Sequence, residues 1–463
     1  MGIVGIIGAD LNKEVSVSKT FRPYDPEQMF LMPLALQDWL PRGHLVYFIS
    51  DVVDHLDLGA IMSRYEEEKG YPPYHPAMMV KVLLYAYCIG IPSSRKIEKR
   101  LEEDIGFRVL SANNTPDFRT ISDFRKDHLR ALGALFLQVL KLCQKAGLVR
   151  LGHVSIDGTK IKANASKHKA MSYKRMKEEE ARLEAEIQDL LKKAATVDEE
   201  EDQRYGKDKR GDELPGELAF REGRLKKIKE AKAALEAEAR LEPEHVQATG
   251  KKATGIPEDK AQRNFTDPDS HIMPAPGGKH FEQAYNAQAA VDSAHQVIVA
   301  AEVTDQPSDR GQALPMMKQV KANTGKLPRQ MSADAGYFSS DAVKELTTEG
   351  IDVYMPPDRM QHTHEMPAAP RGRIPNSLSI VDRMRRKLRT KQGRKRYGLR
   401  KVLPEPVFGQ IKQVRGFRQF LLRGKQKVRG EWNFICAGHN VLKLFVARNQ
   451  GFVRQFTGGE WAR

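Results

Sequence analysis

Three widely spaced carboxylates have the residue types and positions that metal-assisted phosphoryl transfer requires. Asp157 and Asp334 each end a short segment with the pattern of a β-strand, and Glu405 stands before Pro406 at a predicted helix N-terminus. Carboxylates that converge from two strand ends and a helix would bind Mg²⁺, or Mn²⁺ in its place, because hard divalent ions prefer a few oxygen ligands and keep positions open for water and phosphate. Two such ions can clamp the attacking and leaving oxygens of an in-line displacement at phosphorus.

Each of these acids also has a plainer interpretation. Asp157 and Asp334 could be ordinary turn residues at strand ends, and Glu405 could be the salt-bridge partner of the Lys and Arg residues around it. Asp292 is a candidate for a fourth acid near the site, but the tight turn Asp292–His295 makes a turn role the stronger interpretation.

The positive charge of the chain is concentrated around the third acid. The formal net charge is +16, from 76 Lys and Arg against 60 Asp and Glu. Residues 371–429 alone contain 20 Lys or Arg and two acids, so this basic segment carries +18 and the rest of the chain −2. Clustered positive charge of this kind predicts contacts with the phosphates of a nucleic acid.

A disordered tail or a solvated helix face would also explain much of residues 371–400. After Lys401, however, apolar and aromatic residues interleave with the basic ones and require a core, which indicates that the basic side chains there are mounted on folded structure. These apolar residues are Val407, Phe408, Ile411, Val414, Phe417, Phe420, Leu421 and Leu422.

Length and composition exclude several other classes of protein. A chain of 463 residues with 40% apolar and 29% charged residues is typical of a globular protein of two or three domains. No stretch approaches the roughly 18 apolar residues of a membrane-spanning helix, and residues 1–20 are interpreted as a poorly ordered leader and not a signal peptide. A cytoplasmic location is expected.

Cofactors other than divalent cations are not indicated. Cys88, Cys143 and Cys436 are the only cysteines and lie far apart, which excludes a disulfide scaffold and a four-Cys zinc site. His362 and His364 have the spacing of metal ligands but no Cys or acidic partners of ligand pattern, so surface positions are the stronger interpretation. No P-loop pattern occurs, and no nucleotide cofactor is expected.

The elements that must position the acids follow from hydrophobic periodicity. Residues 21–148 have the pattern of a compact all-α domain, most clearly in the helix predicted over Leu129–Lys145, and DNA binding or dimerisation is the role expected of it. Residues 149–463 have the alternating strand and helix patterns of a layered α/β domain. His153–Asp157 is predicted as its first strand, with a turn at Gly158 and Thr159 and a hairpin partner at Lys160–Lys162.

A helical insertion, residues 166–280, interrupts the α/β domain. Two amphipathic helices joined by the polar stretch Glu199–Pro215 are predicted to form an antiparallel hairpin, although a dimer-forming coiled coil is an alternative. Strands are then predicted at Ala287–Asp292, Gln296–Val303, Gln330–Asp334 and Ile351–Met355, and helices at Arg310–Thr324 and Asp341–Glu349.

Several short motifs occur in a characteristic order. Ser155–Lys160 (SIDGTK) carries the first acid, Tyr285–Asp292 (YNAQAAVD) follows the insertion, and Asp334–Ser339 (DAGYFS) carries the second acid. Together with Tyr74–Met79 and Pro116–Arg125 in the helical region, these motifs resemble those of the DDE transposases of bacterial insertion sequences. The resemblance covers roughly residues 20–445.

The C-terminal part resembles the Tyr, Arg, Glu and Lys signature of the same family. Lys412 follows Glu405 after six intervening residues, as the signature requires, and Tyr397 lies upstream. Four residues separate Arg400 from Glu405 where the family has three, whereas Lys401 has the family spacing but is not Arg, so the basic role is left between the two. The DNA contacts expected are Tyr397, Arg400, Lys401, Lys412 and Arg415.

The resemblance implies a fold and a reaction. The fold is an α/β fold, an RNase H-like mixed sheet with helices on both faces, preceded by the all-α domain and interrupted by the helical hairpin. The reaction is Mg²⁺-dependent cleavage of double-stranded DNA at the terminal inverted repeats of a transposon, followed by transfer of the freed 3′-OH to target DNA. Asp157, Asp334 and Glu405 would be the catalytic residues and would hold two metal ions.

The resemblance also carries expectations about assembly and leaves alternatives open. A homodimer is expected because two transposon ends must be cut. Relatives often carry cysteines in the segment 356–396, and this chain has none there, so no structural metal is expected in it. The alternatives are a catalytically silent, transposase-derived DNA-binding protein and a metal-dependent nuclease of the same fold.

Overall fold

The computed structural model describes residues 35–65, 73–205, 216–241, 255–275, 280–358, 371–375, 377–452, 456–457 and 460–461. The leader expected at residues 1–20 lies outside the described residues, as do His362 and His364. Among the helices described, none combines the length and the apolar character needed to cross a membrane.

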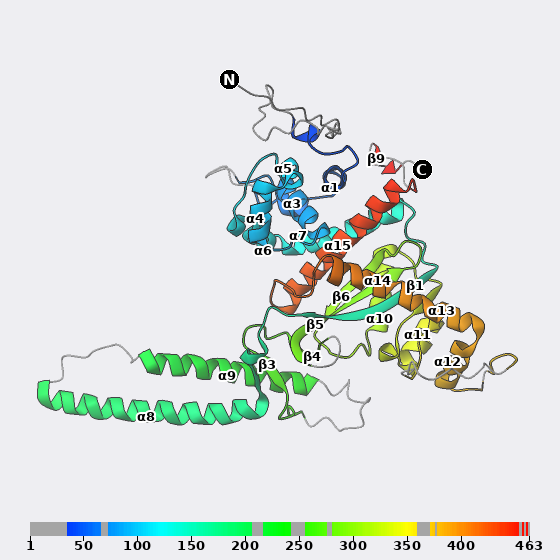
Figure 1. Ribbon diagram of the computed structural model, residues 1–463. Helices are drawn as coiled ribbons and strands as arrows, with labels where there is room; N and C mark the ends of the chain where they lie inside the picture. Colours follow the sequence, from blue (N-terminus) through cyan, green and yellow to red (C-terminus); the bar gives the residue numbers. More distant parts are fainter. Residues whose placement is uncertain are drawn as a thin grey trace, which may run out of the picture.

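Helices fill the described part of the N-terminal region (Figure 1). The carboxylates of Asp104 and Asp117 accept hydrogen bonds from backbone N–H groups in the first turns of α5 and α6, and Pro76 occupies the first turn of α3. The helix predicted over Leu129–Lys145 is confirmed as α7. The elements are η1 (Leu36–Asp38), α1 (Leu45–Asp54), α2 (Gly59–Met62), α3 (Pro76–Cys88), α4 (Ser94–Glu103), α5 (Ile105–Ser111), α6 (Phe118–Asp127) and α7 (Leu129–Lys145).

A six-stranded mixed sheet follows. Its strands are β1 (His153–Lys162), β4 (His271–Pro274), β5 (Phe281–Asp292), β6 (Ile298–Thr304), β7 (Gln330–Ser332) and β8 (Asp352–Tyr354). β5 runs antiparallel to β1, β4 and β6, whereas β7 runs parallel to β1 and β8 parallel to β7. The order is β6–β5–β1–β7–β8, with β4 beside the first residues of β5, so β1 lies in the middle of the sheet.

The hairpin predicted at Gly158 and Thr159 is wrong. β1 runs through both residues to Lys162, because β5 pairs with it along nearly its whole length and leaves no place for a turn. The parallel partner β7 stops earlier, opposite Ser155. Asp157 therefore lies inside a strand, at the point where one of the two neighbouring strands has ended.

The turn predicted at the end of β5 is confirmed. The Asp292 carboxylate is buried and accepts hydrogen bonds from the backbone N–H of Ala294 at 2.9 Å and of Leu151 at 2.7 Å. These bonds close the turn to β6 and fix the segment that leads into β1. Asp292 is thus a turn residue and not a fourth acid of the site.

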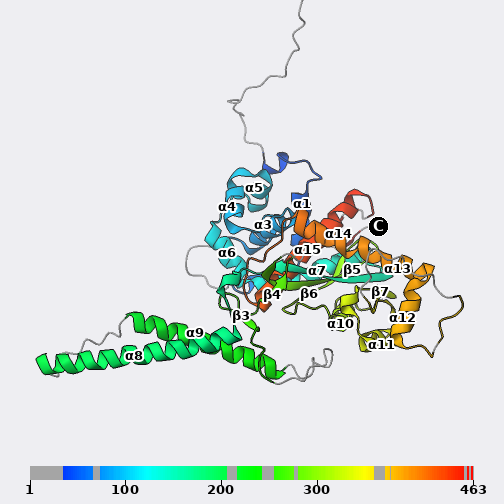
Figure 2. The same cartoon turned by 60° about the horizontal axis from the view of Figure 1, so that its bottom comes forward.

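Helices lie on both sides of the sheet (Figure 2). The edge strand β6 is covered by two of them: Gln319 and Asn323 of α10 donate to backbone carbonyls of β6, and the Asn440 side chain of α15 bonds both the N–H and the carbonyl of Ile298. The remaining elements are α10 (Ala313–Thr324), η5 (Ala335–Tyr337), α11 (Ser340–Thr348), α12 (Ile380–Arg389), α13 (Lys391–Val402), α14 (Pro404–Gly409), the π-helical turn η6 (Gln410–Val414), α15 (Lys425–Asn449), β9 (Phe456–Thr457) and β10 (Glu460–Trp461).

The predicted insertion forms an antiparallel helical hairpin that projects from the body (Figures 1 and 2). It consists of η2 (Lys167–Lys169), β2 (Ala170–Ser172), α8 (Tyr173–Tyr205), α9 (Gly216–Leu241) and β3 (Gln262–Asn264). Leu183, Ile228 and Leu235 belong to a small apolar core of its own, and ion pairs such as Lys232–Glu180 join the two helices. An intramolecular hairpin therefore satisfies the apolar stripes of both helices.

The C-terminal helix α15 ties the two main regions together. It packs against α3 and α7 on one side and against β6 on the other, so one continuous apolar core extends from the N-terminal helices to the sheet. Cys88, Cys143 and Cys436 are all buried in this core and carry free thiols. The division into domains at residues 148 and 149 stays a prediction.

Candidate active site

The register between β1 and β7 brings the first two acids together. Ser155 pairs with Ser332 in this parallel ladder, and their hydroxyls lie 3.0 Å apart. Asp157 and Asp334 each follow two residues later, beyond the end of the ladder. The two acids therefore lie at the same end of neighbouring strands, and the negative charge of Asp334 acts to raise the pKa of Asp157.

Asp157 is held in a nearly buried position. Its Oδ1 accepts a hydrogen bond from the N–H of Gly158 at 2.9 Å, and 15% of its side chain is exposed. Burial raises the pKa of Asp157 to about 7, and the negative charges of Asp334 and Asp309 act in the same direction, against the Arg400 guanidinium. The carboxylates of the site are thus only partly neutralised by positive groups, and this favours the binding of a cation.

Asp334 is fixed by the turn that it starts. Its side chain caps η5, with Oδ1 accepting a hydrogen bond from the N–H of Gly336 at 2.8 Å. Ser339 then caps α11 by accepting a hydrogen bond from the N–H of Ala342, so the helix predicted over Asp341–Glu349 begins one residue earlier, at Ser340. The two caps restrain the segment that carries the second acid.

Glu405 reaches the site from the first turn of α14, as predicted from Pro406. One guanidinium links it to Asp157: Nη1 of Arg400 lies 3.3 Å from Oδ2 of Asp157, and Nη2 lies 3.6 Å from Oε1 of Glu405. Half of the Glu405 side chain is exposed, whereas only 19% of Arg400 is. The third acid therefore stands at the open side of the site.

The structure separates the two candidates for the basic position. Arg400 is the residue between the acids, and Lys401 is exposed. Tyr397, one turn earlier on α13, is half-buried, and burial raises the pKa of its phenol. Tyr397 and Arg400 thus face the site together, and Lys401 does not lie between the acids.

Lys412 lies against the strand that carries the first acid. Its Nζ donates to Oγ1 of Thr159 at 2.9 Å and to the carbonyl oxygen of Lys160 at 3.0 Å. Burial lowers the pKa of this amine. Because Thr159 is two residues from Asp157 on β1, Lys412 brings a cation to the same face of the strand.

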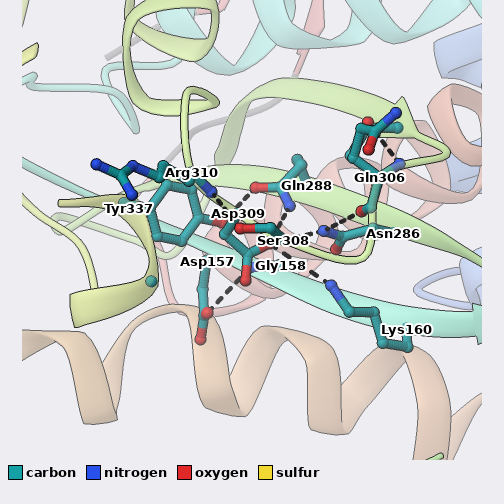
Figure 3. Close-up of polar contacts among 12 residues, drawn as sticks. Asp157, Gly158, Lys160, Asn286, Gln288, Gln306, Ser308, Asp309, Arg310 and Tyr337 are labelled. Carbon is teal, nitrogen blue, oxygen red and sulfur yellow. Dashed lines mark hydrogen bonds and ion pairs between the residues drawn. The ribbon is translucent and has the colours of Figure 1, made fainter. Parts of the chain in front are cut away.

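A polar cluster centred on Asp309, a residue outside all the motifs, lies behind Asp157 (Figure 3). Oδ1 of Asp309 accepts hydrogen bonds from the side-chain amides of Asn286 at 2.7 Å and Gln288 at 2.8 Å, and the Lys160 ammonium lies 3.7 Å away. The Tyr337 hydroxyl donates to the other end of the Gln288 amide. Asp309 was missed because it stands in the loop before α10 with no recognisable neighbour.

Comparison with protein families gives two matches. Residues 34–127 match the family described as Transposase domain (DUF772), and residues 372–445 match the family described as Transposase DDE domain. The first match covers N-terminal helices, and the second contains Tyr397, Arg400, Glu405 and Lys412. The chain thus carries an N-terminal transposase domain and a transposase DDE domain. The reaction class of this transposase is therefore phosphoryl transfer on DNA.

The family matches are consistent with the fold, but they do not include all of the proposed site residues. A helical region followed by a mixed sheet with helices is consistent with the RNase H-like fold of DDE transposases, as expected. Asp157 and Asp334 lie outside both matched segments. No curated protein and no solved structure matches the transposase chain.

The donor set of the transposase suits a hard divalent ion. Asp157, Asp334 and Glu405 offer only carboxylate oxygens, the ligands that Mg²⁺ and Mn²⁺ prefer. Among the described residues, no group of three His, Cys, Asp or Glu side chains is already gathered as a metal site. Arg400 lies between Asp157 and Glu405 and balances the negative charge that a cation would balance.

Arg415 does not belong to the DNA-binding surface of the transposase, and the sequence prediction for it needs correction. Its side chain is 5% exposed, and Nη1 donates to the carbonyl oxygens of Tyr87 and Ile435 in the core. Val414, one of the apolar residues predicted to require a core, is instead 80% exposed. The π-helical turn Gln410–Val414 accommodates one extra residue per turn and changes which side chain faces inward.

A sequence signal for the Asp309 cluster does exist in the transposase. Asn286 and Gln288 alternate on β5 and are fully buried, although both are polar. Buried amides need hydrogen-bond partners, so two of them on one face of a strand indicate a polar group packed against that face. The two amides indicate which face of β5 packs against a polar group, but they do not identify that group as Asp309.

Proposed function

We propose that this transposase cuts double-stranded DNA at the terminal inverted repeats of its element and transfers the freed 3′-OH to target DNA. Asp157, Asp334 and Glu405 are the proposed catalytic carboxylates and hold two Mg²⁺ ions, or Mn²⁺ in their place. The observation that carries the proposal is the link of Asp157 to Glu405 through Arg400, beside Asp334. The three acids thus lie together: Asp157 comes from β1, Asp334 from the turn after β7, and Glu405 from the first turn of α14.

The chemistry requires charge balance and alignment. When bound, the divalent ions supply Lewis-acid stabilisation of the charge that develops on the transferred phosphate. The carboxylates orient them, and their positions on a central strand and on two capped or packed turns limit movement of the site. Most of the rate enhancement then comes from positioning and electrostatic stabilisation.

The cationic side chains of the site bind the DNA backbone. Arg400 has a planar guanidinium that can form two hydrogen bonds to one phosphate, and in the DNA complex it turns from the carboxylates to a phosphate beside the scissile bond. Tyr397 lies one turn from Arg400 on α13 and offers a hydroxyl to the same phosphate. Lys412 contacts a further phosphate along β1. The exposed basic side chains of α12 and α13 extend this surface.

The N-terminal helices and the assembly complete the proposal. Residues 21–148 bind DNA, mediate dimerisation, or do both, and two protomers act on the two ends of the element. The helices dock on α15, which follows the third acid, so an end bound by them lies on the same rigid core as the site. The protein would work in the bacterial cytoplasm, associated with the nucleoid.

A plasmid that carries the inverted repeats flanking this gene tests the proposal. With Mg²⁺, the wild-type protein should cut the ends and join them to target DNA, and EDTA should stop both steps. Asp157→Asn, Asp334→Asn and Glu405→Gln should each abolish cleavage while DNA binding persists. Asp341→Asn and Glu349→Gln, which alter exposed acids of α11 and its end, are the matched controls and should cut normally.

The same assay distinguishes the alternatives. Cleavage without joining would identify a nuclease of the same fold. Specific end binding by the wild type without any cleavage would identify a silent DNA-binding protein. Normal cleavage by all three acid variants would overturn the assignment of the site.

A further inference from the structure

Asp309 is a partly buried loop residue that accepts hydrogen bonds from a neighbouring strand. It lies between β6 and α10, and 21% of its side chain is exposed. One carboxylate oxygen, Oδ1, accepts both amide hydrogen bonds, from Asn286 and Gln288, and lies nearest to the Lys160 ammonium (Figure 3). The other partner of the Asn286 amide is the carbonyl oxygen of Gln306, in the same loop. Two hydrogen bonds and one ion pair therefore hold this loop carboxylate in a defined position.

The strand register puts these donors behind the first acid. Gly158 lies opposite Gln288 and Lys160 opposite Asn286, so all four residues share one face of the β1–β5 ladder. Asp157 alternates to the other face, where Arg400 meets it. The Asp309 cluster therefore supports β1 from the side opposite to the Asp157 carboxylate.

Gly158 shows how closely the cluster supports the strand. A Cβ atom at this position would lie 2.4 Å from Nε2 of Gln288 and 2.7 Å from Oδ1 of Asp309, closer than real Cβ contacts allow. The cluster thus packs directly on the backbone of the residue that follows Asp157, and that same residue donates its N–H to the Asp157 carboxylate.

The cluster also reaches the second acid. Tyr337, fully buried in the turn after Asp334, donates its hydroxyl to Gln288. A Cβ placed on Gly336, whose N–H binds Asp334, would lie 3.6 Å from Oδ2 of Asp309. One carboxylate is therefore in contact with the supports of both acids.

Asp309 also balances a buried positive charge. The Lys160 ammonium is buried and has no hydrogen-bond partner among the described residues, and Asp309 is the carboxylate with which it forms an ion pair, at 3.7 Å. Asp157 and Asp334 also attract this ammonium. Without Asp309, the cation would be drawn to the two acids that must hold metal ions.

We propose that Asp309 is a positioning residue of the DNA-cleavage reaction. It fixes the backbone at Gly158 and, through Gln288, the turn at Tyr337, and it keeps the Lys160 charge away from Asp157 and Asp334. This inference rests on the proposed function, because it assumes that Asp157 and Asp334 hold the metal ions.

Asp309→Asn and Lys160→Met, alone and combined, form the test. Asn keeps a carbonyl oxygen for the two amides but loses the charge, and Met keeps the length of Lys without the ammonium. We expect Asp309→Asn to lower kcat about 10- to 100-fold with little change in KM, as loss of a supporting contact does. DNA affinity in EDTA should stay at the wild-type value.

The double variant separates positioning from other roles. If Asp309 restrains the Lys160 charge, removing that charge should recover at least part of the activity lost in Asp309→Asn, so the two effects should not multiply. Multiplying effects, or wild-type kcat in Asp309→Asn, would overturn the proposal. Thermal unfolding checks that each variant is folded, and Asp341→Asn is the matched control.

Failure of the inference and failure of the proposed function give different results. If wild-type protein does not cut DNA, or if Asp157→Asn cuts normally, the proposed function fails. If wild-type protein cuts, Asp157→Asn does not, and Asp309→Asn matches the wild type, then only the role of Asp309 fails.

Discussion

Arg400 and Asp157 are 243 residues apart in the chain, yet the guanidinium of one lies 3.3 Å from the carboxylate of the other. The same guanidinium lies 3.6 Å from Glu405. The guanidinium thus bridges two of the three carboxylates. Arginine fits both demands on this position, because its planar group pairs with carboxylates and with phosphates in the same geometry.

Substitution of Arg400 should impair cleavage far more than substitution of Lys401. Arg400→Ala removes a donor aimed at the reacting phosphate, and we expect a fall in kcat of about 10²- to 10³-fold. Lys401→Ala removes an exposed charge and should weaken DNA binding slightly at low salt. Single-turnover cleavage of a labelled end measures both. Equal losses in the two variants would return the basic role to Lys401.

Lys412→Ala should reduce the salt dependence of end binding. If the amine contacts one phosphate, its removal should make the slope of log K against log salt shallower by about one, with affinity lowered evenly across sequences. Fluorescence anisotropy in EDTA at several salt concentrations gives the slope. Lys226→Ala, which removes an exposed lysine of α9 on the projecting hairpin, is the control. An unchanged slope in Lys412→Ala would exclude Lys412 from the phosphate contacts.

The sequence predicts that Asp157 and Asp334 lie close together better than it predicts the secondary structure around each of them. Both acids follow β-branched or apolar segments, and neighbouring strands bring such residues together. The pattern Lys160–Lys162 after Gly158 resembles a new strand, because a glycine inside a strand and a glycine in a turn look alike in sequence. Only the Asp309 cluster, which packs where a side chain would otherwise be, explains why glycine stands there.

Contacts that depend on tertiary packing could not be predicted from the sequence pattern. Spacing could not choose between Arg400 and Lys401, because a helix break at Leu403 separates both residues from Glu405 and spacing alone does not give the geometry of such a break. The charge count of residues 371–429 likewise treats Arg415 as one more surface cation. The π-helical turn before it decides that Arg415 faces the core and Val414 faces solvent.

His439 should make the protein less stable as the pH falls. Its side chain is buried on α15, and burial, with the charge of Arg415, lowers the pKa of the imidazole to about 3. The unfolded chain binds a proton near pH 6.5 and the folded chain does not, so stability is retained above pH 6.5 and is lost below it by about 1.4 kcal/mol per pH unit.

Urea unfolding at pH 7 and pH 5 measures this loss. His439→Gln should be less stable than the wild type at pH 7, because it loses a packed ring and the contact with the Gln296 carbonyl. Its stability should nevertheless fall less between the two pH values, by the contribution of one proton. The same pH dependence in both proteins would mean that His439 is protonated in the folded state.

Arg415→Met should leave DNA binding unchanged and should not destabilise the protein. The guanidinium is buried, Nε and Nη2 have no hydrogen-bond partner among the described residues, and burial lowers the pKa of the group. Its two hydrogen bonds, at 3.4 Å to Tyr87 and 3.3 Å to Ile435, go to carbonyls of residues within α3 and α15. A buried charge without a carboxylate partner costs more than an apolar side chain of similar length, so Met should raise the free energy of unfolding or leave it unchanged.

Arg415→Ala distinguishes packing from charge at the same position. It removes the charge as Met does but leaves a cavity between α3 and α15, and should lower the free energy of unfolding by about 2 kcal/mol or more. Urea unfolding reports stability, and anisotropy reports the affinity and salt slope for a transposon end. If Arg415→Met is folded and as stable as the wild type but binds DNA with a shallower salt slope, the guanidinium leaves the core to contact phosphate, and the exposed Val414 beside it marks a segment that changes conformation on DNA.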